Sequence, residues 1–203
     1  MSQPLQDQDR DIADMKRLAG GQDGALNELM ARHGPKLFKY LIRCLQNEED
    51  AADIAQETFV RIYQHRSRFD SRQRFSTWLY SIATNLSRDR FRWRSRHPTV
   101  SLQAEDEHSG ITLLQNLPDP EATPSQRMER DERAEAVRKA VAALPEELRI
   151  PLLLVEYEGL SQVEIATILK CSAKAVEMRL YRARTRLREE LQGIKRDWCD
   201  SQS

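Results

Sequence analysis

Glycine, proline and cysteine are scarce in this sequence of 203 residues, which holds 7 glycines, 8 prolines and 3 cysteines. So few turn-forming residues disfavour a β-sandwich, which needs many tight turns, and favour amphipathic helices. Cys44, Cys171 and Cys199 are odd in number and far apart, and they form neither a CxxC motif nor a cysteine–histidine pair at metal-ligand spacing. We therefore expect reduced thiols in a cytoplasmic protein, with no bound metal.

Long apolar runs and catalytic motifs are also missing. No stretch approaches the ~18 apolar residues of a transmembrane helix, and the first residues lack the apolar core of a signal peptide. There is no glycine-rich phosphate loop, and His33, His65, His97 and His108 form no triad or metal motif. The sequence thus predicts a cytoplasmic protein that is not an enzyme and needs no cofactor.

Charge is segregated along the chain, although the formal net charge is zero. Residues 61–97 contain ten arginines and two acidic residues, a net charge of +8. Residues 101–135 contain nine acidic residues and three arginines, a net charge of −6. Residues 172–196 contain eight basic residues and three glutamates, a net charge of +5. Two basic segments on either side of an acidic one indicate two surfaces for an anionic partner such as nucleic acid.

Apolar residues recur at helical spacing in two parts of the chain, and no stretch alternates for long with the period of a strand. The sequence therefore predicts an all-α fold with two small helical domains. In the first domain we expect helices near residues 11–18, 26–44, 49–65 and 75–94. The third of these should bury Ala52, Ala55, Phe59 and Ile62, and the fourth should bury Phe75, Trp78, Leu79, Ile82, Ala83 and Leu86.

Between the two parts the periodicity disappears. Three prolines and the stretch AEDEHSG predict a flexible acidic linker, which cannot bury enough apolar surface to fold alone. Helical spacing resumes near Arg130, Pro145 suits the first turn of a helix, and Pro151 predicts that this helix starts late or kinks. The predicted organisation is a first domain at 8–97, a linker at 98–129, a second domain at 130–193 and a tail at 194–203.

The sharpest local pattern lies at residues 160–191. Ser161 followed by Glu164 fits a capping box, which would open a short helix. A tight turn at Lys170-Cys171-Ser172 follows, in which Ser172 can cap the next helix. The short helix should bury Val163, Ala166 and Ile168, and the longer one should bury a stripe of Val176, Leu180, Ala183, Leu187 and Leu191.

A short helix, a tight turn and a longer basic helix form a helix-turn-helix, whose second helix lies in the DNA major groove. Its arginines can bind guanine edges, and other basic groups can neutralise phosphates. An amphipathic hairpin with merely solvated arginines is the alternative, but the order of caps and the excess positive charge favour DNA. Lys174, Met178, Tyr181 and Arg188 should face away from the apolar stripe, with Arg179, Arg182 and Arg184 beside them.

The first domain carries two further candidate surfaces. Asp53, Gln56, Glu57 and Val60 share one helix face, which suggests a protein partner that presents arginines. Acids in a first helical turn also suit the helix dipole without any partner, so both interpretations stay open. The segment that follows interleaves arginines with aromatic residues, a pattern that suits single-stranded DNA. Phe75 and Trp78 are expected to face inward, whereas Ser81, Asn85, Arg88 and Arg92 should form an exposed polar stripe.

Taken in order, these segments resemble the extracytoplasmic-function (group 4) sigma factors, which direct bacterial RNA polymerase to promoters. The resemblance covers nearly the whole chain. It is carried by DAADIAQETFVRIY at 50–63, FSTWLYSIATNLSRDRFRWR at 75–94 and LPEELRIPLLLVEYEGLSQVEIATILKCSAKAVEMRLYRARTRLREEL at 144–191. It implies an all-α fold in which sigma region 2 and a region 4 helix-turn-helix are joined by the linker.

The resemblance also implies partners and residue roles. The β′ clamp coiled coil of core RNA polymerase would be bound by Asp50, Asp53, Ile54, Gln56, Glu57 and Val60, and region 4 would meet the β flap. The −10 promoter element would be recognised and melted by Phe69, Arg72, Arg74, Tyr80, Ser81, Asn85, Arg88 and Arg92. The −35 duplex would be read by Ser172, Lys174, Glu177, Met178, Arg179, Tyr181, Arg182 and Arg184.

One departure concerns Glu177, since relatives often carry a basic residue there, so the −35 preference cannot be copied from them. The resemblance further implies control by an anti-sigma factor, often bound to the inner membrane. The main rival is an ordinary helix-turn-helix regulator that binds duplex DNA without polymerase. That rival would explain the second domain but neither the acidic face around Asp53 nor the basic aromatic helix.

Overall fold

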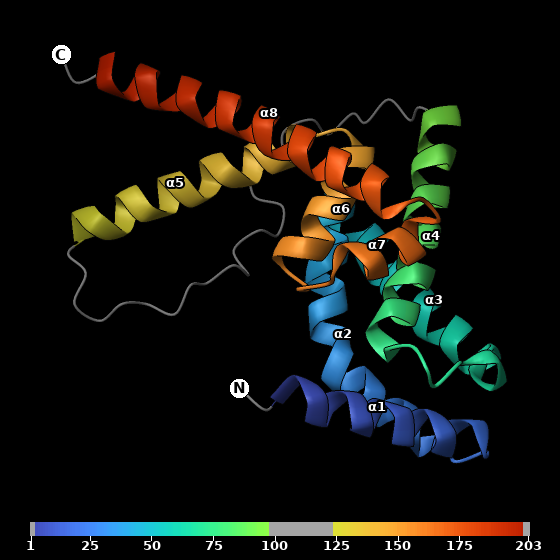
Figure 1. Ribbon diagram of the computed structural model, residues 1–203. Helices are drawn as coiled ribbons and strands as arrows, with labels where there is room; N and C mark the ends of the chain where they lie inside the picture. Colours follow the sequence, from blue (N-terminus) through green and yellow to red (C-terminus); the bar gives the residue numbers. More distant parts are fainter. Residues whose placement is uncertain (1–2, 98–123, 201–203) are drawn as a thin grey trace.

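The computed structural model describes residues 3–97 and 124–200, and every regular element in this part of the chain is helical, as the spacing predicts (Figure 1). Five elements belong to the first half and four to the second. They are α1 (Gln3–Ala19), α2 (Gly24–Leu45), α3 (Glu48–Gln64), the 3-10 turn η1 (Arg66–Arg68), α4 (Phe75–Arg96), α5 (Pro124–Ala143), α6 (Glu146–Glu156), α7 (Gln162–Leu169) and α8 (Ala173–Asp200).

Buried ion pairs connect α1 to α2. Asp11 and Asp14 are both buried, and the two carboxylates accept from the guanidinium of Arg32, with Asp14 Oδ2 lying 2.9 Å from Arg32 Nη2. His33 Nε2 lies 2.8 Å from Asp11 Oδ1 and its ring packs 4.9 Å from Phe75. Removing one partner of such a group would leave a buried charge uncompensated, so this network fixes where α1 lies.

The helices α2, α3 and α4 pack together as the body of the first half. Asn47 starts α3, because its side chain accepts from the amide of Asp50 at 2.8 Å. Asp50 is buried and pairs with Arg90 and Arg94 of α4, the Arg90 Nη1 to Asp50 Oδ1 distance being 2.8 Å. A cap followed by a cross-helix ion pair therefore sets the position of α3 against α4.

In the second half, α5 packs against α8, and the two helices diverge as they extend away from the remaining helices (Figure 1). The N-terminal part of α8 packs on α6 and α7 through Val176, Leu180 and Ala183, which are all buried. Leu187 and Leu191 continue this stripe as half-buried residues. The predicted apolar stripe is therefore confirmed along the helix, and it leaves the opposite face in solvent.

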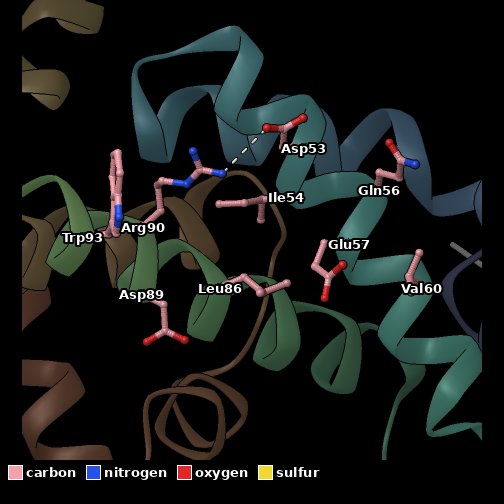
Figure 2. A pocket seen from close by; sticks show the side chains of 9 residues that line it. All are labelled: Asp53, Ile54, Gln56, Glu57, Val60, Leu86, Asp89, Arg90 and Trp93. Atoms are coloured by element: carbon pink, nitrogen blue, oxygen red, sulfur yellow. Dashed lines mark ion pairs between the residues drawn. The ribbon is translucent and has the colours of Figure 1, made fainter. Parts of the chain in front are cut away.

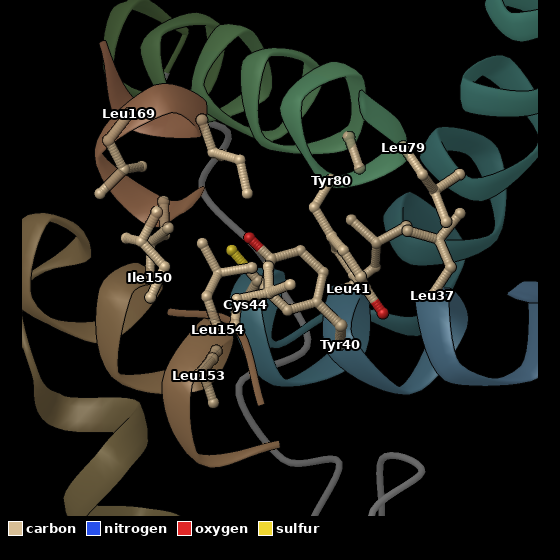
Figure 3. Packing of buried hydrophobic residues seen from close by; sticks show 14 of the residues in the cluster. Leu37, Tyr40, Leu41, Cys44, Leu79, Tyr80, Ile150, Leu153, Leu154 and Leu169 are labelled. Atoms are coloured by element: carbon tan, nitrogen blue, oxygen red, sulfur yellow. The ribbon is translucent and has the colours of Figure 1, made fainter. Parts of the chain in front are cut away.

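One hydrophobic core joins the two halves (Figure 3). Tyr40 and Leu41 of α2 and Leu79 of α4 share a cluster with Ile150 and Leu154 of α6, and all five are fully buried. Each fully buried leucine or isoleucine contributes roughly 1.5–3 kcal/mol relative to an exposed side chain. Apolar burial is thus the main force that holds the second half against the first.

Several helices begin or end at other residues than the spacing predicts. The first helix begins at Gln3 and ends at Ala19, so it is longer than the predicted 11–18. Helix α5 begins at Pro124, inside the stretch predicted as linker, while residues 98–123 of that prediction lie outside the described residues. Helix α8 runs to Asp200, through most of the predicted tail. Helix α6 begins at Glu146 with Pro151 inside it, so of the two predicted alternatives, a late start or a kink, the late start is wrong.

Two predicted core residues face solvent instead. Val163 is 69% exposed, and Ile165, Ala166, Ile168 and Leu169 form the buried face of α7. Ala52 is also exposed on α3. The buried residues of α3 are Asp50, Ala51, Ile54, Thr58, Phe59 and Ile62, while Ala55 is half-buried. Of the predicted inward face of α4, Phe75, Leu79, Ala83 and Leu86 are buried, and Trp78 and Ile82 are half-buried.

Candidate nucleic-acid and protein interfaces

The helix-turn-helix at α7 and α8 is built from two capped helices. Ser161 and Glu164 form the capping box in full: the Ser161 amide donates to Glu164 Oε2 at 2.8 Å, and Ser161 Oγ accepts from the Glu164 amide at 3.3 Å. Lys170 ends α7 in the left-handed conformation, at a φ of 52°. Ser172 Oγ then accepts from the Ala175 amide at 3.1 Å and caps α8. The predicted order of cap, turn and cap is confirmed.

Because the capping box satisfies two amides of α7, Ser161→Ala should lower the free energy of unfolding by about 1 kcal/mol. Urea denaturation followed by circular dichroism measures this change. Ser161→Thr keeps the hydroxyl acceptor and serves as the matched control, for which we expect a much smaller loss. Equal stability of the alanine variant and the native chain would contradict this role of the cap.

The first turns of α8 present a mixed polar and aromatic face to solvent. Met178 is 41% exposed and Tyr181 is 67% exposed, and five further residues of the predicted −35 set are exposed: Ser172, Lys174, Glu177, Arg182 and Arg184. Lys174 Nζ lies 2.9 Å from Glu177 Oε1, one turn along the helix. This face is therefore free to enter a groove, with one carboxylate among its basic groups.

Two arginines of the same helix are held by neighbouring side chains. Arg179 is half-buried, and its Nη1 lies 3.6 Å from Cys171 Sγ. Arg184 Nη2 lies 2.9 Å from Glu156 Oε1 of α6, in an exposed ion pair. Exposed pairs of this kind are weak, so Arg184 can exchange its carboxylate for a phosphate.

An acidic face on α3 borders a groove of about 490 Å³ between α3 and α4 (Figure 2). Asp53, Gln56 and Val60 are exposed and Glu57 is half-buried, so the predicted face forms. Arg90 of α4 approaches it, with Nη2 at 3.7 Å from Asp53 Oδ2. Glu57 Oε1 lies 2.9 Å from Arg61 Nε within α3. Asp53 is accessible to a basic partner, and Glu57 is partly accessible.

Two residues of the predicted polymerase-binding set are buried. Asp50 is turned inward to Arg90 and Arg94, so its carboxylate serves the contact between α3 and α4. Ile54 is only 4% exposed, although it lies in the wall of the groove. Trp93 at the end of α4 forms the opposite wall and is 47% exposed, with its ring stacked 5.0 Å from His97. Sequence patterns alone did not place Trp93 on any surface.

The basic aromatic helix α4 begins beside a cluster of three rings. The ring centroids of Phe69 and Trp78 are 5.3 Å apart, and those of Phe69 and Phe75 are 6.1 Å apart. Phe75 is buried, whereas Phe69 and Trp78 keep part of their surface in solvent. Arg72 is exposed in the loop that precedes the helix. The loop therefore offers an aromatic and basic edge, as stacking on unpaired bases requires.

The remaining predicted −10 residues divide into two groups. Ser81 and Asn85 are half-buried, and Arg92 is exposed and paired with Asp89 at 3.1 Å. Arg74, Tyr80 and Arg88 instead contact the second half of the chain. The exposed stripe predicted from spacing is thus only partly exposed.

Contacts between the halves were not predicted at all. Arg74 Nη1 lies 3.3 Å from Glu164 Oε1, Arg88 Nε lies 3.5 Å from Glu146 Oε1, and Tyr80 donates its hydroxyl to Glu158. The guanidinium of Arg43 stacks on the ring of Tyr157 at 4.0 Å, and that of Arg149 lies 5.7 Å from the Phe91 ring. No local pattern in the sequence predicts these pairs, because the two residues of each pair are separated by tens of residues.

Burial at this contact shifts the ionisation of its carboxylates. Burial raises the pKa of Glu158, against the opposing effects of the Tyr80 hydroxyl and nearby cations. Burial also tends to raise the pKa of Glu164, but its hydrogen bonds with Ser161 and the charge of Arg74 outweigh that effect and lower its pKa overall. Burial raises the pKa of the Tyr80 hydroxyl, so that group stays protonated and donates.

Cys44 and Cys171 are free thiols. Cys44 is buried, and burial raises the pKa of its thiol to about 12. Cys171 is half-buried beside Arg179. Among residues 3–97 and 124–200, histidine, cysteine and carboxylate side chains form no cluster that could hold a metal ion. In the same part of the chain, no helix has the length and apolar character needed to cross a bilayer.

Known protein families match both halves of the chain. The family model Sigma-70 region 2 matches residues 29–97, and the model Sigma-70, region 4 matches residues 134–187. The first covers the acidic face and the basic aromatic helix, and the second covers the helix-turn-helix. The class defined by this fold and these surfaces is therefore that of sigma-70 transcription initiation factors, which are not enzymes.

Individual relatives narrow the family. The RNA polymerase sigma-H factor of Pseudomonas aeruginosa is 33% identical over 195 residues, which span 95% of this chain and 98% of the relative. The ECF RNA polymerase sigma factor SigW of Bacillus subtilis is 32% identical over 181 residues, 89% of this chain and 96% of the relative. The structure of CnrH in complex with the cytosolic domain of CnrY matches with a TM-score of 0.65 at 28% identity, covering 91% of this chain and 98% of that chain. The chain belongs to the extracytoplasmic-function (ECF) sigma factors.

Proposed function

We propose that this sigma factor binds core RNA polymerase through α3, reads a −35 duplex with α8 and captures the melted −10 strand with α4. The polymerase site comprises Asp53, Gln56, Glu57 and Val60, which would bind basic side chains of the β′ clamp coiled coil. The second half, predicted at 130–193, would meet the β flap. The first half, predicted at 8–97, would hold the −10 element.

The observation that supports this assignment best is the exposure of opposite charge on two helices of one chain. The side chain of Asp53 on α3 is 62% exposed, and the side chain of Lys174 on α8 is 72% exposed. An acidic face repels nucleic acid and suits a basic protein surface, whereas a basic helix suits phosphate. A regulator that binds only DNA would not need the acidic face on α3.

The −10 assignment rests on the edge formed by Phe69, Trp78 and Arg72. A base extruded from the duplex loses its stacking, at a cost of a few kcal/mol, and rings with neighbouring cations can offset that loss. Phe69 and Trp78 supply partly exposed rings, and Arg72 supplies positive charge for the backbone. Duplex opening would therefore end with a base held against this edge.

Control by a protein inhibitor is the second part of the proposal. CnrH, a structural relative over most of the chain, was solved with the cytosolic domain of CnrY bound. An anti-sigma factor would compete with polymerase for the exposed acidic face of α3. We place the chain in the cytoplasm, where a membrane-bound inhibitor would hold it at the inner membrane until a signal releases it.

In vitro transcription tests the proposal directly. Purified chain is added to core RNA polymerase that lacks any other sigma factor, a genomic DNA library serves as template, and the start sites are mapped. We expect initiation at a discrete set of sites with a shared −35 and −10 sequence. Specific duplex binding without polymerase, together with no start-site selection in its presence, would instead favour a classical helix-turn-helix regulator.

Glu177 should set part of the −35 preference. A carboxylate at this position can accept from the N4 amino group of cytosine, and it repels phosphate. We expect Glu177→Gln to weaken discrimination at one −35 base pair by about 1–3 kcal/mol, a factor of roughly 5 to 150. Selection from a promoter library with randomised −35 sequences measures this change. Glu189→Gln is the charge-matched control, and an unaltered base preference in Glu177→Gln would exclude the contact.

A further inference from the structure

Apolar side chains lie at the centre of the solvent-facing side of α8. Val176, Leu180 and Ala183 mark the buried side of this helix. Met178 lies two residues from both Val176 and Leu180, which places it about 160–200° around the helix from them. Tyr181 follows Met178 after one turn, and both residues are among the large apolar side chains that remain exposed. The face that would enter a groove of DNA therefore has apolar atoms at its centre.

The charged residues of this face lie around the apolar pair. Lys174 Nζ lies 2.9 Å from Glu177 Oε1, so these two opposite charges partly compensate each other. Arg182 is exposed next to the pair. Arg179 and Arg184 flank the buried stripe, and each is engaged by a neighbouring side chain. Hydrogen-bonding groups are thus available at the edges of the contact, whereas its middle is occupied by a thioether and a phenol ring.

The major groove of B-DNA presents one apolar group, which is the C5 methyl group of thymine. The other groups at the base edges are hydrogen-bond donors and acceptors. A thioether placed over a G·C pair would remove water from such groups without replacing the lost hydrogen bonds, which costs free energy. Placed over an A·T pair, the same side chain can bury the methyl group, which is favourable. An apolar centre therefore favours A·T pairs beneath it.

Positive charge around the pair favours DNA over a protein as the partner of this face. Residues 172–196 include eight basic residues and three glutamates, and Arg182, Arg186 and Arg188 are all exposed. Such a surface attracts the phosphate backbones on both sides of a major groove, which would hold the apolar centre of the helix against the base edges. A protein that covered the same pair would need its own acidic groups to compensate the arginines.

We propose that Met178 and Tyr181 read the −35 element through thymine methyl groups, so that A·T pairs lie beneath the centre of α8. The proposal rests on the function proposed above for α8 and names the chemical group that this helix recognises. Arg182 and Glu177 would bind the neighbouring base pairs through hydrogen bonds. Specificity would then combine apolar contacts in the middle of the element with polar contacts beside it.

Deoxyuridine tests the proposal because it lacks the methyl group of thymidine but keeps the same base pairing and the same O4 acceptor. The −35 sequence is taken from the start sites that the chain selects with core RNA polymerase. In a set of promoter duplexes, one −35 thymine at a time is replaced by uracil, on either strand. Each duplex competes with a labelled native promoter for the complex of full-length chain and core polymerase. Duplexes with uracil between the −35 and −10 elements are the matched controls.

We expect uracil to weaken binding about fourfold at one or two −35 positions, the loss expected for one methyl group that is no longer buried. Uracil between the two elements should leave the affinity unchanged. Met178→Ala and Tyr181→Ala should each abolish the difference between thymine and uracil at one of these positions. Because the affinities for two duplexes are compared within one variant, a general loss of binding cancels in the ratio.

Conservative variants separate the apolar contact from a structural role. Met178→Leu and Tyr181→Phe keep an apolar side chain of similar size, so both should remain sensitive to the missing methyl group. Arg186→Ala, which removes an exposed arginine farther along α8, should also keep this sensitivity. Circular dichroism verifies that each variant folds. If an alanine variant fails to fold, the response of the native chain to uracil decides the question.

Equal affinity of the native chain for all thymine and uracil duplexes would overturn the proposal, as would a −35 element without thymine on either strand. Either result would point to a protein as the partner of Met178 and Tyr181. Both results leave the proposed function standing, provided that start sites still depend on the −35 sequence. Start sites that do not depend on it, or no start-site selection, would overturn the −35 assignment of α8 as well.

Discussion

Replacing Asp53 and Glu57 with lysine should weaken binding to core RNA polymerase by about 100-fold, or roughly 3 kcal/mol. Both side chains are accessible on α3, and their present partners are only Arg90 at 3.7 Å and the neighbouring Arg61. A basic surface on the polymerase would outcompete such exposed pairs, and lysine would repel it. Fluorescence titration of labelled chain with core polymerase measures the affinity.

Two controls separate this effect from loss of structure. Glu28→Lys/Glu132→Lys makes the same change in net charge at exposed positions away from the α3–α4 groove and should bind polymerase normally. Asp53→Asn/Glu57→Gln removes the charges without reversing them, so it should show a smaller loss. Helical content should be the same in all three variants. An affinity of the lysine variant close to that of the native chain would count against the polymerase site on α3.

Replacing two arginines on α8 with alanine should abolish most −35-dependent transcription. Arg179→Ala and Arg182→Ala should each cost about 1–3 kcal/mol by removing hydrogen bonds to a base edge, so transcription by the double variant should fall roughly 30-fold or more. Arg182 is exposed beside Tyr181, and Arg179 is half-buried against Cys171. In vitro transcription with native and scrambled −35 sequences measures the effect.

The matched control is Arg186→Ala, which removes an exposed arginine farther along the same helix. If it contacts only phosphate, it should weaken transcription to a similar degree on every template and reduce the dependence on salt. The Arg179→Ala/Arg182→Ala variant should instead lose the difference between native and scrambled −35 sequences. Retention of that difference would show that other residues read the −35 element.

Local spacing predicted the helices well because each buries one face, and a buried face leaves a period in the sequence. The capping box at Ser161 was predictable for a similar reason, since all its atoms lie within four residues. The error at Val163 is one of phase. Val163 precedes Ile165 by two residues, which places it about 200° around the helix from the buried face. Alanine at position 52 is too small for its hydrophobicity to show which way it points.

The site was less predictable than the fold because its decisive contacts join distant residues. The family resemblance assigned Asp50 to the polymerase-binding set, but two arginines of α4 about 40 residues later turn it inward. Tyr80 belongs to the segment in which arginines and aromatic residues alternate, but its hydroxyl donates to Glu158, in the turn after α6. Periodic spacing of apolar residues indicates that one face of a helix is buried. It does not indicate which other helix covers that face. Charge segregation indicated two basic surfaces without indicating that acids of the second half would cover one of them.

The shared core has a consequence for the lifetime of the protein in the cell. Pulling the halves apart would bring Cys44 and Leu154, which are now wholly inside, into contact with water. Newly wetted aliphatic surface of this kind drives self-association and invites proteolysis. A chain that left its transcription complex and stayed extended would soon be degraded. A chain whose two halves pack together again would remain available to bind polymerase.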